Sequence, residues 1–110
     1  MICREWTCRS LPDNADRYER LLTSEILPSL DEAPGCLGAY VLRRSVDEHI
    51  EFSVLHLFES HEAVLAFAGE DYEFAVVPAA ARPLLSSFDR RARHYEVRAV
   101  PNRLRADDAE

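Results

Sequence analysis

The 110-residue sequence contains no lysine, and all 13 of its basic side chains are arginines. Schiff-base and lysine-nucleophile chemistry are therefore excluded. The 20 acidic side chains outnumber the arginines and give a net charge of −7. Such a surface repels the phosphates of nucleic acids and of anionic lipids. We therefore expect no nucleic-acid partner.

Long apolar runs are also missing. No stretch approaches the roughly 20 apolar residues that span a membrane, and the opening Met-Ile-Cys-Arg-Glu-Trp lacks the apolar segment of a signal peptide. We expect a cytoplasmic protein with no membrane partner. Its length is usual for one domain, and its hydrophobic fraction of 47% is normal for a globular protein.

Cysteine is scarce, and the three thiols are Cys3, Cys8 and Cys36. An odd number of cysteines without Cys-x-x-Cys spacing is typical of neither a disulfide framework nor a zinc site. We expect reduced, buried thiols. No set of His, Cys, Asp and Glu has the spacing of metal ligands, so we predict no bound metal.

Apolar periodicity divides the chain into strands and helices. Asp13 is a candidate cap for the first helix, Pro28 should kink or restart it, and Ala33-Pro34-Gly35 ends it. The predicted elements are strands at 2–9, 36–45, 50–59 and 88–98, a helix between residues 13 and 33, and a second helix at 61–68. The second and third strands form a hairpin with a polar tip at 46–49.

The last third of the chain is less regular. Residues 70–78 are compatible with one helical turn, and 79–87 with a short third helix. We predict one domain over 1–99 and a disordered acidic tail over 100–110.

The order of the elements, β-α-β-β-α-β, is that of the ferredoxin-like motif, an α+β fold with a four-stranded antiparallel sheet. Strand one lies between strands three and four, and helices cover one face of the sheet. The other face would carry Glu51, Ser53, Leu55 and Leu57. A half-apolar face of this kind favours a homodimer in which two sheets pack together.

Several short motifs resemble one family. They are the opening MICREW, the helix ending in APG, the hairpin ending in HLFES, the AFAGEDYE stretch and the closing RHYEV. Together they span about residues 1–98 and are similar to the antibiotic biosynthesis monooxygenase family. The resemblance implies a dimeric α+β barrel. The fold hosts cofactor-free monooxygenases, haem-degrading enzymes, cyclases and isomerases, so the fold alone does not fix the reaction.

Haem-degrading members of the family carry an Asn, a Trp and a ligating His in their site. The resemblance places Trp6 at the first position, Phe67 at the second, and Val76, Val77 and Pro78 around the third. The sequence departs from the pattern at all three positions, which argues against haem degradation. We expect no cofactor.

The quinone-forming monooxygenases of aromatic polyketide pathways provide a second comparison. They carry a Trp at the end of strand three, where this chain has Phe58, and a pocket Asn, where it has Val54. The resemblance therefore implies a similarly placed pocket with different polar groups.

The strand faces suggest which residues line such a pocket. The helix-facing sets would be Arg4, Trp6 and Cys8 on strand one, Gly38, Tyr40 and Leu42 on strand two, Phe52, Val54, His56 and Phe58 on strand three, and Ala92, His94 and Glu96 on strand four. We name His94, His56 and Arg4 as candidate catalytic residues and Trp6, Tyr40, Phe58, Phe67 and Tyr72 as candidate substrate-binding residues. A one-residue slip in the last strand would replace His94 by Tyr95.

These residue types suit oxidation without a cofactor. A phenol or enol that loses a proton to His94 or His56 is electron-rich enough to react with dioxygen, and Arg4 would hold the anion. The same groups would serve a cyclase or an isomerase, or a protein that only binds an aromatic molecule. Each also has a structural interpretation, since His94 could bond backbone and Arg4 could pair with Glu5 or Glu96.

Overall fold

The structure, a computed structural model, describes residues 1–102. Residues 103–110, most of the tail that we predict to be disordered, lie outside the described residues. The strands are β1 (Ile2–Ser10), β2 (Cys36–Val46), β3 (His49–Phe58), β4 (Ser87–Phe88) and β5 (Arg93–Glu96), and the helices are α1 (Pro12–Leu21), η1 (Leu22–Ile26), α2 (Leu27–Leu30), α3 (His61–Ala68) and η2 (Arg82–Leu84).

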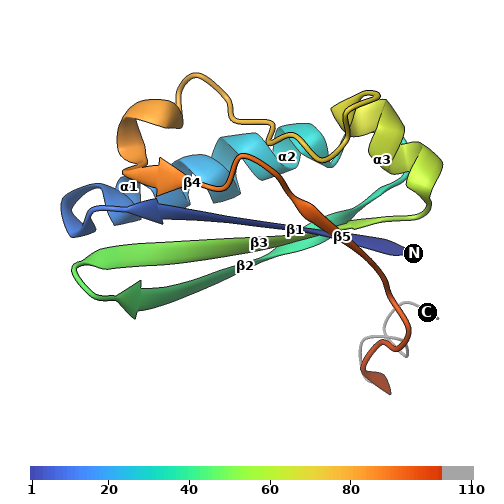
Figure 1. Ribbon diagram of the computed structural model, residues 1–110, viewed down its shortest axis with the longest axis horizontal. Coiled ribbons are helices and arrows are strands. Elements are labelled where there is room, and N and C mark those ends of the chain that lie inside the picture. The colour runs from blue at the N-terminus through green and yellow to red at the C-terminus, as the bar shows by residue number, and fades with distance from the viewer. Residues whose placement is uncertain (103–110) are drawn as a thin grey trace.

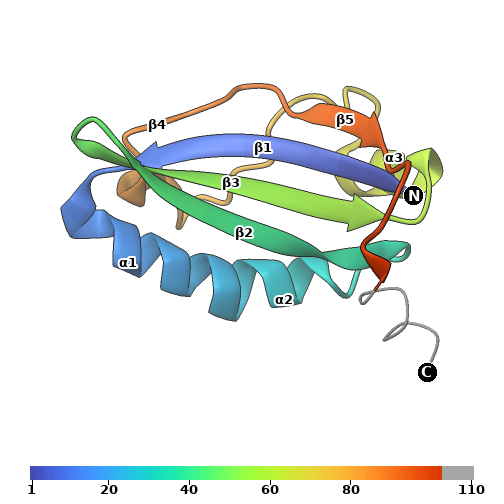
Figure 2. The same ribbon diagram turned by 90° about the horizontal axis from the view of Figure 1, so that it is seen from below.

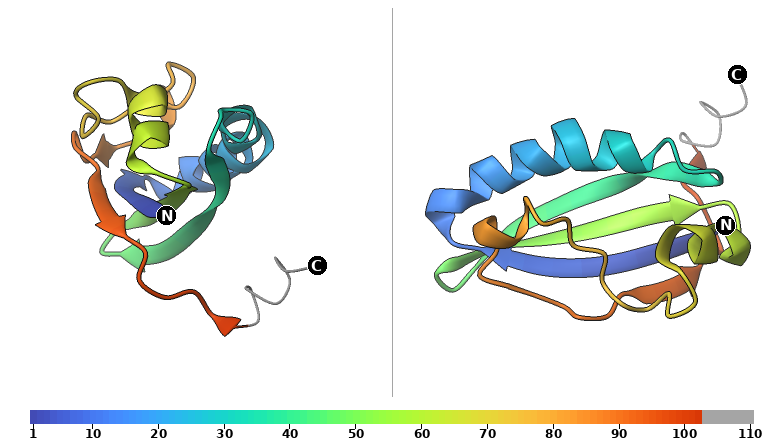
Figure 3. Two further views of the ribbon diagram at one scale, coloured as in Figure 1. Left: turned by 90° about the vertical axis from the view of Figure 1, so that its right-hand side faces the viewer. Right: turned by 90° about the horizontal axis from the view of Figure 1, so that it is seen from above.

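The strands form one antiparallel sheet with β1 at its centre. Their order is β2-β3-β1-β4, and β5 pairs with β1 further along the same edge as β4. The helices lie on one side of this sheet (Figures 1 and 3), and the core of Cys8, Tyr18, Leu22 and Phe52 fills the space between the two layers. The predicted α+β, ferredoxin-like class is therefore confirmed.

The first helix runs from Pro12 to Leu30 in three parts. It begins at Pro12 rather than after Asp13, because proline suits the first helical position, where no N–H is needed. At Pro28, where we expect a kink or a restart, the chain instead widens into the π-helical segment η1 just before it. The Leu27 N–H donates to the Leu22 carbonyl, five residues back. This wider turn accommodates a proline that has no N–H of its own to donate.

The prediction of one continuous last strand over 88–98 is wrong. It is divided into β4 and β5. The Asp89 N–H still donates to the Thr7 carbonyl of β1 at 2.9 Å, but the backbone at 90–92 pairs with residues 73–75, before η2, instead of with β1. The Ala75 N–H donates to the Arg90 carbonyl at 2.8 Å, and the Ala92 N–H donates to the Glu73 carbonyl at 2.6 Å.

The segment 70–87 contains less helix than expected, and the difference lies at 79–87, since the single turn allowed by residues 70–78 is present. Residues 71–74 form a single turn closed by the Phe74 N–H and the Asp71 carbonyl. Of the short helix expected at 79–87, only the 3-10 turn η2 exists, since Leu85 is already extended and the Ser86 N–H bonds the Arg9 carbonyl of β1.

The face assigned to Tyr40 is wrong. The β2–β3 hairpin turns at Asp47 and Glu48, so Val46 pairs with His49 and Tyr40 pairs with Leu55. Paired residues share a face, so Tyr40 lies with Leu55 on the side away from the helices. The helix-facing residues of β2 are instead Ala39, Val41 and Arg43, not Gly38, Tyr40 and Leu42.

The side of the sheet away from the helices, here called the bare face, carries no helix in the single chain, and only the segment after β5 lies against one end of it, beside Tyr40 and Leu57 (Figure 2). Near the hairpin it is polar, because Glu51 lies between Arg44 at 3.3 Å and Arg9 at 3.7 Å. Further along it is apolar, with Tyr40, Leu42 and Tyr95 all nearly half exposed. Among residues 1–102, no helix has the length and apolar character needed to cross a membrane.

Candidate active site

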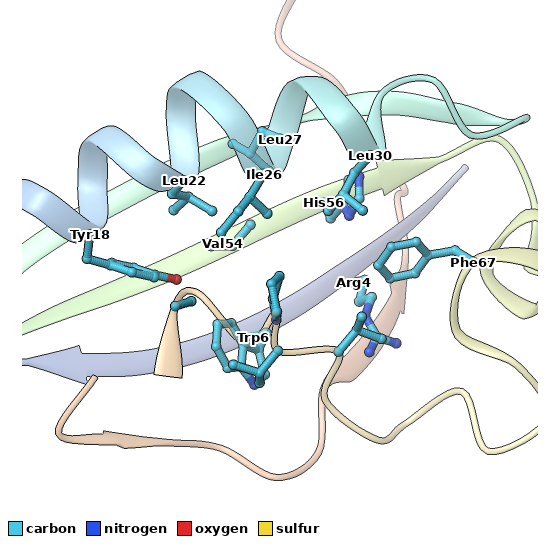
Figure 4. Close-up of a pocket in the computed structure, with 14 residues that line it drawn as sticks. Arg4, Trp6, Tyr18, Leu22, Ile26, Leu27, Leu30, Val54, His56 and Phe67 are labelled. Carbon is cyan, nitrogen blue, oxygen red and sulfur yellow. The ribbon is translucent and has the colours of Figure 1, made fainter. Parts of the chain in front are cut away.

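A pocket that is partly open to solvent lies between the sheet and the helices. Figure 4 shows Arg4 and Trp6 of β1, and Val54 and His56 of β3, below the apolar side chains of the first helix. The full lining is Arg4, Trp6, Tyr18, Leu22, Ile26, Leu27, Leu30, Val54, His56, Phe67, Val76, Val77, Pro78 and Ala81. It is a mainly apolar cavity with few polar groups, the usual form of a small-molecule site.

Arg4 is the only strong cation of this lining. Its side chain is buried, with an exposed fraction of 5%. Nη1 donates to the Tyr72 carbonyl and to His94 Nε2, and Nη2 donates to the Phe74 carbonyl at 2.8 Å. Within the described part of the chain, no carboxylate pairs with it, so the structural interpretation that pairs Arg4 with Glu5 or Glu96 is wrong. Burial lowers the pKa of Arg4, yet guanidinium remains charged in proteins. The pocket wall therefore carries an unneutralised positive charge.

His94, on the neighbouring strand β5, hydrogen-bonds to Arg4. The last strand has the register that places His94, not Tyr95, opposite Arg4 on the helix side of the sheet. The distance from Arg4 Nη1 to His94 Nε2 is 2.9 Å. Because a guanidinium can only donate, Nε2 must be the unprotonated acceptor. Burial, and then the charge of Arg4, lower the pKa of His94 accordingly. His94 does not line the pocket, so the structure gives it a position suited to orienting Arg4.

His56 does line the pocket, and its ring is 4% exposed. It pairs with Arg4 across the β1–β3 ladder. Burial is the main cause that lowers its pKa, with a smaller contribution from Arg4. His56 Nε2 lies 2.9 Å from the Sγ of Cys36, a contact between β3 and β2 that the sequence analysis does not anticipate.

Aromatic side chains form the walls beside these polar groups. Trp6 lies in the pocket lining, and its indole N–H donates to the Asp89 carbonyl at 2.6 Å, so only its ring is available to a ligand. Phe67 also lines the pocket and lies 5.4 Å from Arg4 Cζ, within the range of a cation–π contact. Phe58 is fully buried behind them, with its ring centroid 4.4 Å from that of His56.

Three of the predicted substrate-binding residues, Tyr40, Phe58 and Tyr72, do not line the pocket. Tyr72 contacts Arg4 through its carbonyl oxygen, and its ring lies 5.1 Å from His94 on the outer side of the site. Tyr40 is on the opposite face of the sheet, as the hairpin register requires. Leu22, Ile26 and Leu27 of the first helix form a further pocket wall that is not among the predicted site residues. The spacing of these apolar residues along the helix is the signal in the sequence that points to such a wall.

The family described as "Antibiotic biosynthesis monooxygenase" matches residues 1–79, more than half of the chain. The chain belongs to the antibiotic biosynthesis monooxygenase family. No curated protein matches the chain closely enough to be reported as a relative.

Solved structures share the fold of this family member. A protein of Caulobacter crescentus named for the family is 25% identical, covers 90% of this chain and 89% of its own, and has a TM-score of 0.61. A similarly named protein of Deinococcus radiodurans is 19% identical, covers 91% and 95%, and has a TM-score of 0.62. The heme-degrader MhuD of Mycobacterium tuberculosis, solved with two hemes in its active site, is 20% identical, covers 91% and 98%, and has a TM-score of 0.58.

The positions compared with haem-degrading members of the antibiotic biosynthesis monooxygenase family do meet at the pocket. Trp6, Phe67, Val76, Val77 and Pro78 all line it. None of these side chains offers an iron ligand. The cavity is thus in the place that the resemblance implies, but the residues at those positions do not fit haem.

Proposed function

We propose that the protein is a cofactor-independent monooxygenase that oxidises an aromatic, polyketide-like molecule bound as its phenolate or enolate. The observation that supports this proposal is the buried guanidinium of Arg4, which borders an apolar pocket and has neutral hydrogen-bond partners. An anion on a flat, apolar molecule would neutralise that charge. Burial from water strengthens such a pairing.

The bound anion would be the reductant for dioxygen. In the conversion of an anthrone to a quinone, a CH₂ group becomes a carbonyl, one oxygen atom enters that carbon, and the second oxygen leaves as water with the two hydrogens. The reaction balances without an external electron donor. Arg4 would favour loss of the substrate's proton by stabilising the anion, while Trp6 and Phe67 would hold the ring and exclude water.

Oxygen uptake with a hydroxylated anthrone as the probe tests the proposal. We expect one dioxygen consumed per quinone formed. The Arg4→Met variant should lose about 10- to 150-fold in affinity for the ionisable probe, because a charge-assisted hydrogen bond contributes about 1.5–3 kcal/mol. Arg4→Lys should retain part of the activity.

Two controls make the test specific. Arg17→Met removes an exposed arginine on α1 and should change nothing. An O-methylated probe, which cannot ionise at that oxygen, should bind wild type and Arg4→Met equally. Turnover without oxygen uptake would instead support a cyclase or isomerase that uses the same anion site, and tight binding without turnover would support a binding protein.

We also propose that two copies pair through the bare face of the sheet. Tyr40, Leu42 and Tyr95 are exposed there in the single chain, and exposed apolar patches of this kind mark interfaces. Light scattering should give about twice the chain mass of 12.6 kDa. Tyr40→Arg should give a monomer, whereas Leu65→Arg on α3 should remain a dimer. A monomeric wild-type protein would contradict this interface.

A further inference from the structure

Three potential metal ligands from separate elements meet at one end of the pocket. Asp31 caps the C-terminus of α2, Cys36 is the first residue of β2, and His56 lies on β3. One ligand atom from each lies within 4.8 Å of the other two. Leu30, the residue before Asp31, lines the pocket together with His56 (Figure 4).

A β-bulge creates this meeting point. Cys36 pairs with Phe58 and Gly38 pairs with Leu57, so one extra residue of β2 lies between these pairs. The bulge turns Cys36 to the helix-facing side that His56 occupies. Without it, the alternation of β2 would place the thiol on the bare face.

We propose that Asp31, Cys36 and His56 bind one Zn²⁺ ion. Thiolate, imidazole and carboxylate are the three ligand types that zinc takes in proteins. Three protein ligands would leave the fourth tetrahedral position for water or a bound molecule. This site does not depend on the proposed monooxygenase function.

The distances are close to those that zinc requires. Zinc–ligand bonds of about 2.0–2.3 Å at tetrahedral angles place ligand atoms roughly 3.4–3.6 Å apart. Cys36 Sγ lies 3.6 Å from Asp31 Oδ1 and 2.9 Å from His56 Nε2. Of these two distances, only the second must change, by an opening of roughly 0.6 Å as the ion replaces the shared proton. The ligand atoms of Asp31 and His56 lie within 4.8 Å of each other, and the exposed Asp31 side chain can close any remaining gap.

Two of the ligands are held in place before any ion arrives. The His56 ring packs against Phe58 at 4.4 Å and Phe67 at 5.4 Å between centroids. The Cys36 N–H donates to the Ala33 carbonyl at 3.2 Å, in the turn that follows α2. Asp31 is exposed and can adjust from the helix end. A largely preformed set of donors lowers the cost of ordering a metal site.

Zinc titration by calorimetry, on full-length untagged protein stripped with a chelator, tests the site. We expect one Zn²⁺ per chain. Loss of a ligand in Cys36→Ser or in Asp31→Asn should weaken zinc binding by more than about tenfold. Even residues that only hydrogen-bond to a metal ligand typically change metal affinity by at least about that factor when they are replaced. Cobalt(II) should give a thiolate-to-metal charge-transfer band in wild type that is absent in Cys36→Ser.

Cys3→Ser is the matched control, because Cys3 is a half-buried thiol on the bare face of the sheet and should leave zinc affinity and the cobalt band unchanged. Asp31→Asn changes an exposed side chain and should not affect folding. Wild type that takes up no zinc, or either ligand variant that retains wild-type affinity, would overturn the proposal. Oxygen uptake by chelator-treated protein is a separate result that addresses the monooxygenase proposal alone.

Discussion

Gly35 is the tightest point of the fold, and its replacement by alanine has a cost that can be worked out. Gly35 has φ +80°, and a Cβ added there would lie 2.5 Å from the Cβ of Ala63 on α3, a distance that real Cβ atoms essentially never show. The left-handed backbone costs about 1–2 kcal/mol for a residue with a Cβ. The overlap adds about 1–3 kcal/mol. Gly35→Ala should therefore lower the free energy of unfolding by about 2–5 kcal/mol.

Gly69 provides the control for backbone strain alone. It has φ +86°, and a Cβ there would have nothing within 4 Å. Gly69→Ala should cost about 1–3 kcal/mol, the range for a backbone conformation reserved for glycine. Both variants thus place a Cβ at a positive φ, and only Gly35→Ala also has the overlap with α3.

Removing the opposing methyl group isolates the overlap. Ala63→Gly alone should cost about 1 kcal/mol of helix propensity. In the double variant with Gly35→Ala, the overlap disappears. The losses in free energy of unfolding measured for the two single variants should therefore sum to about 1–3 kcal/mol more than the loss measured for the double variant. Urea unfolding followed by the fluorescence of Trp6, at one fixed protein concentration, measures each value. Additivity within about 0.5 kcal/mol would refute the close approach of Gly35 and Ala63.

Two further predictions concern pH and the pocket. Burial and Arg4 lower the pKa of His94 from 6.5, so below that pH the unfolded chain binds more protons and the free energy of unfolding falls as pH falls. His94→Gln should flatten this decline between about pH 7 and 5 in urea titrations, and an unchanged decline in that variant would contradict the reasoning. Val54→Phe should fill the pocket, keep the fold, and abolish binding of the anthrone probe in calorimetry; unchanged binding would place the ligand elsewhere.

The fold could be predicted from the sequence where periodicity is strong. The strand β1 alternates along its whole length, so Arg4, Trp6 and Cys8 were assigned to the correct face. Tyr40 was not, because its face depends on which residues pair across the hairpin, and the pairing follows from the turn at Asp47 and Glu48. Alternation shows only that neighbouring residues point to opposite faces of the sheet. Which residue points to which face depends on the strand pairing, and the turn sets that pairing.

The site could be predicted only in part for a similar reason. Arg4, His56, Trp6 and Phe67 were named from strand faces and from resemblance, and they line one cavity. The division of the last strand depends on backbone bonds between Glu73, Ala75 and the segment 90–92, for which side-chain patterns give no signal.

The contact of Cys36 with His56 could not be predicted from spacing. It depends on a one-residue bulge, and the bulge is visible only once the two strands are paired.

Two parts of the pocket lining differ in rigidity. Arg4 lies on β1, which is hydrogen-bonded to neighbouring strands on both sides, so its amides should be among the slowest to exchange with solvent. The part of the lining at Val76, Val77 and Pro78 belongs to no helix or strand. The charged group is therefore fixed, while this part of the lining is on a segment that tolerates substitution. Selection for new substrates would act mainly on residues 76–78, and it would leave the anion-binding arginine unchanged.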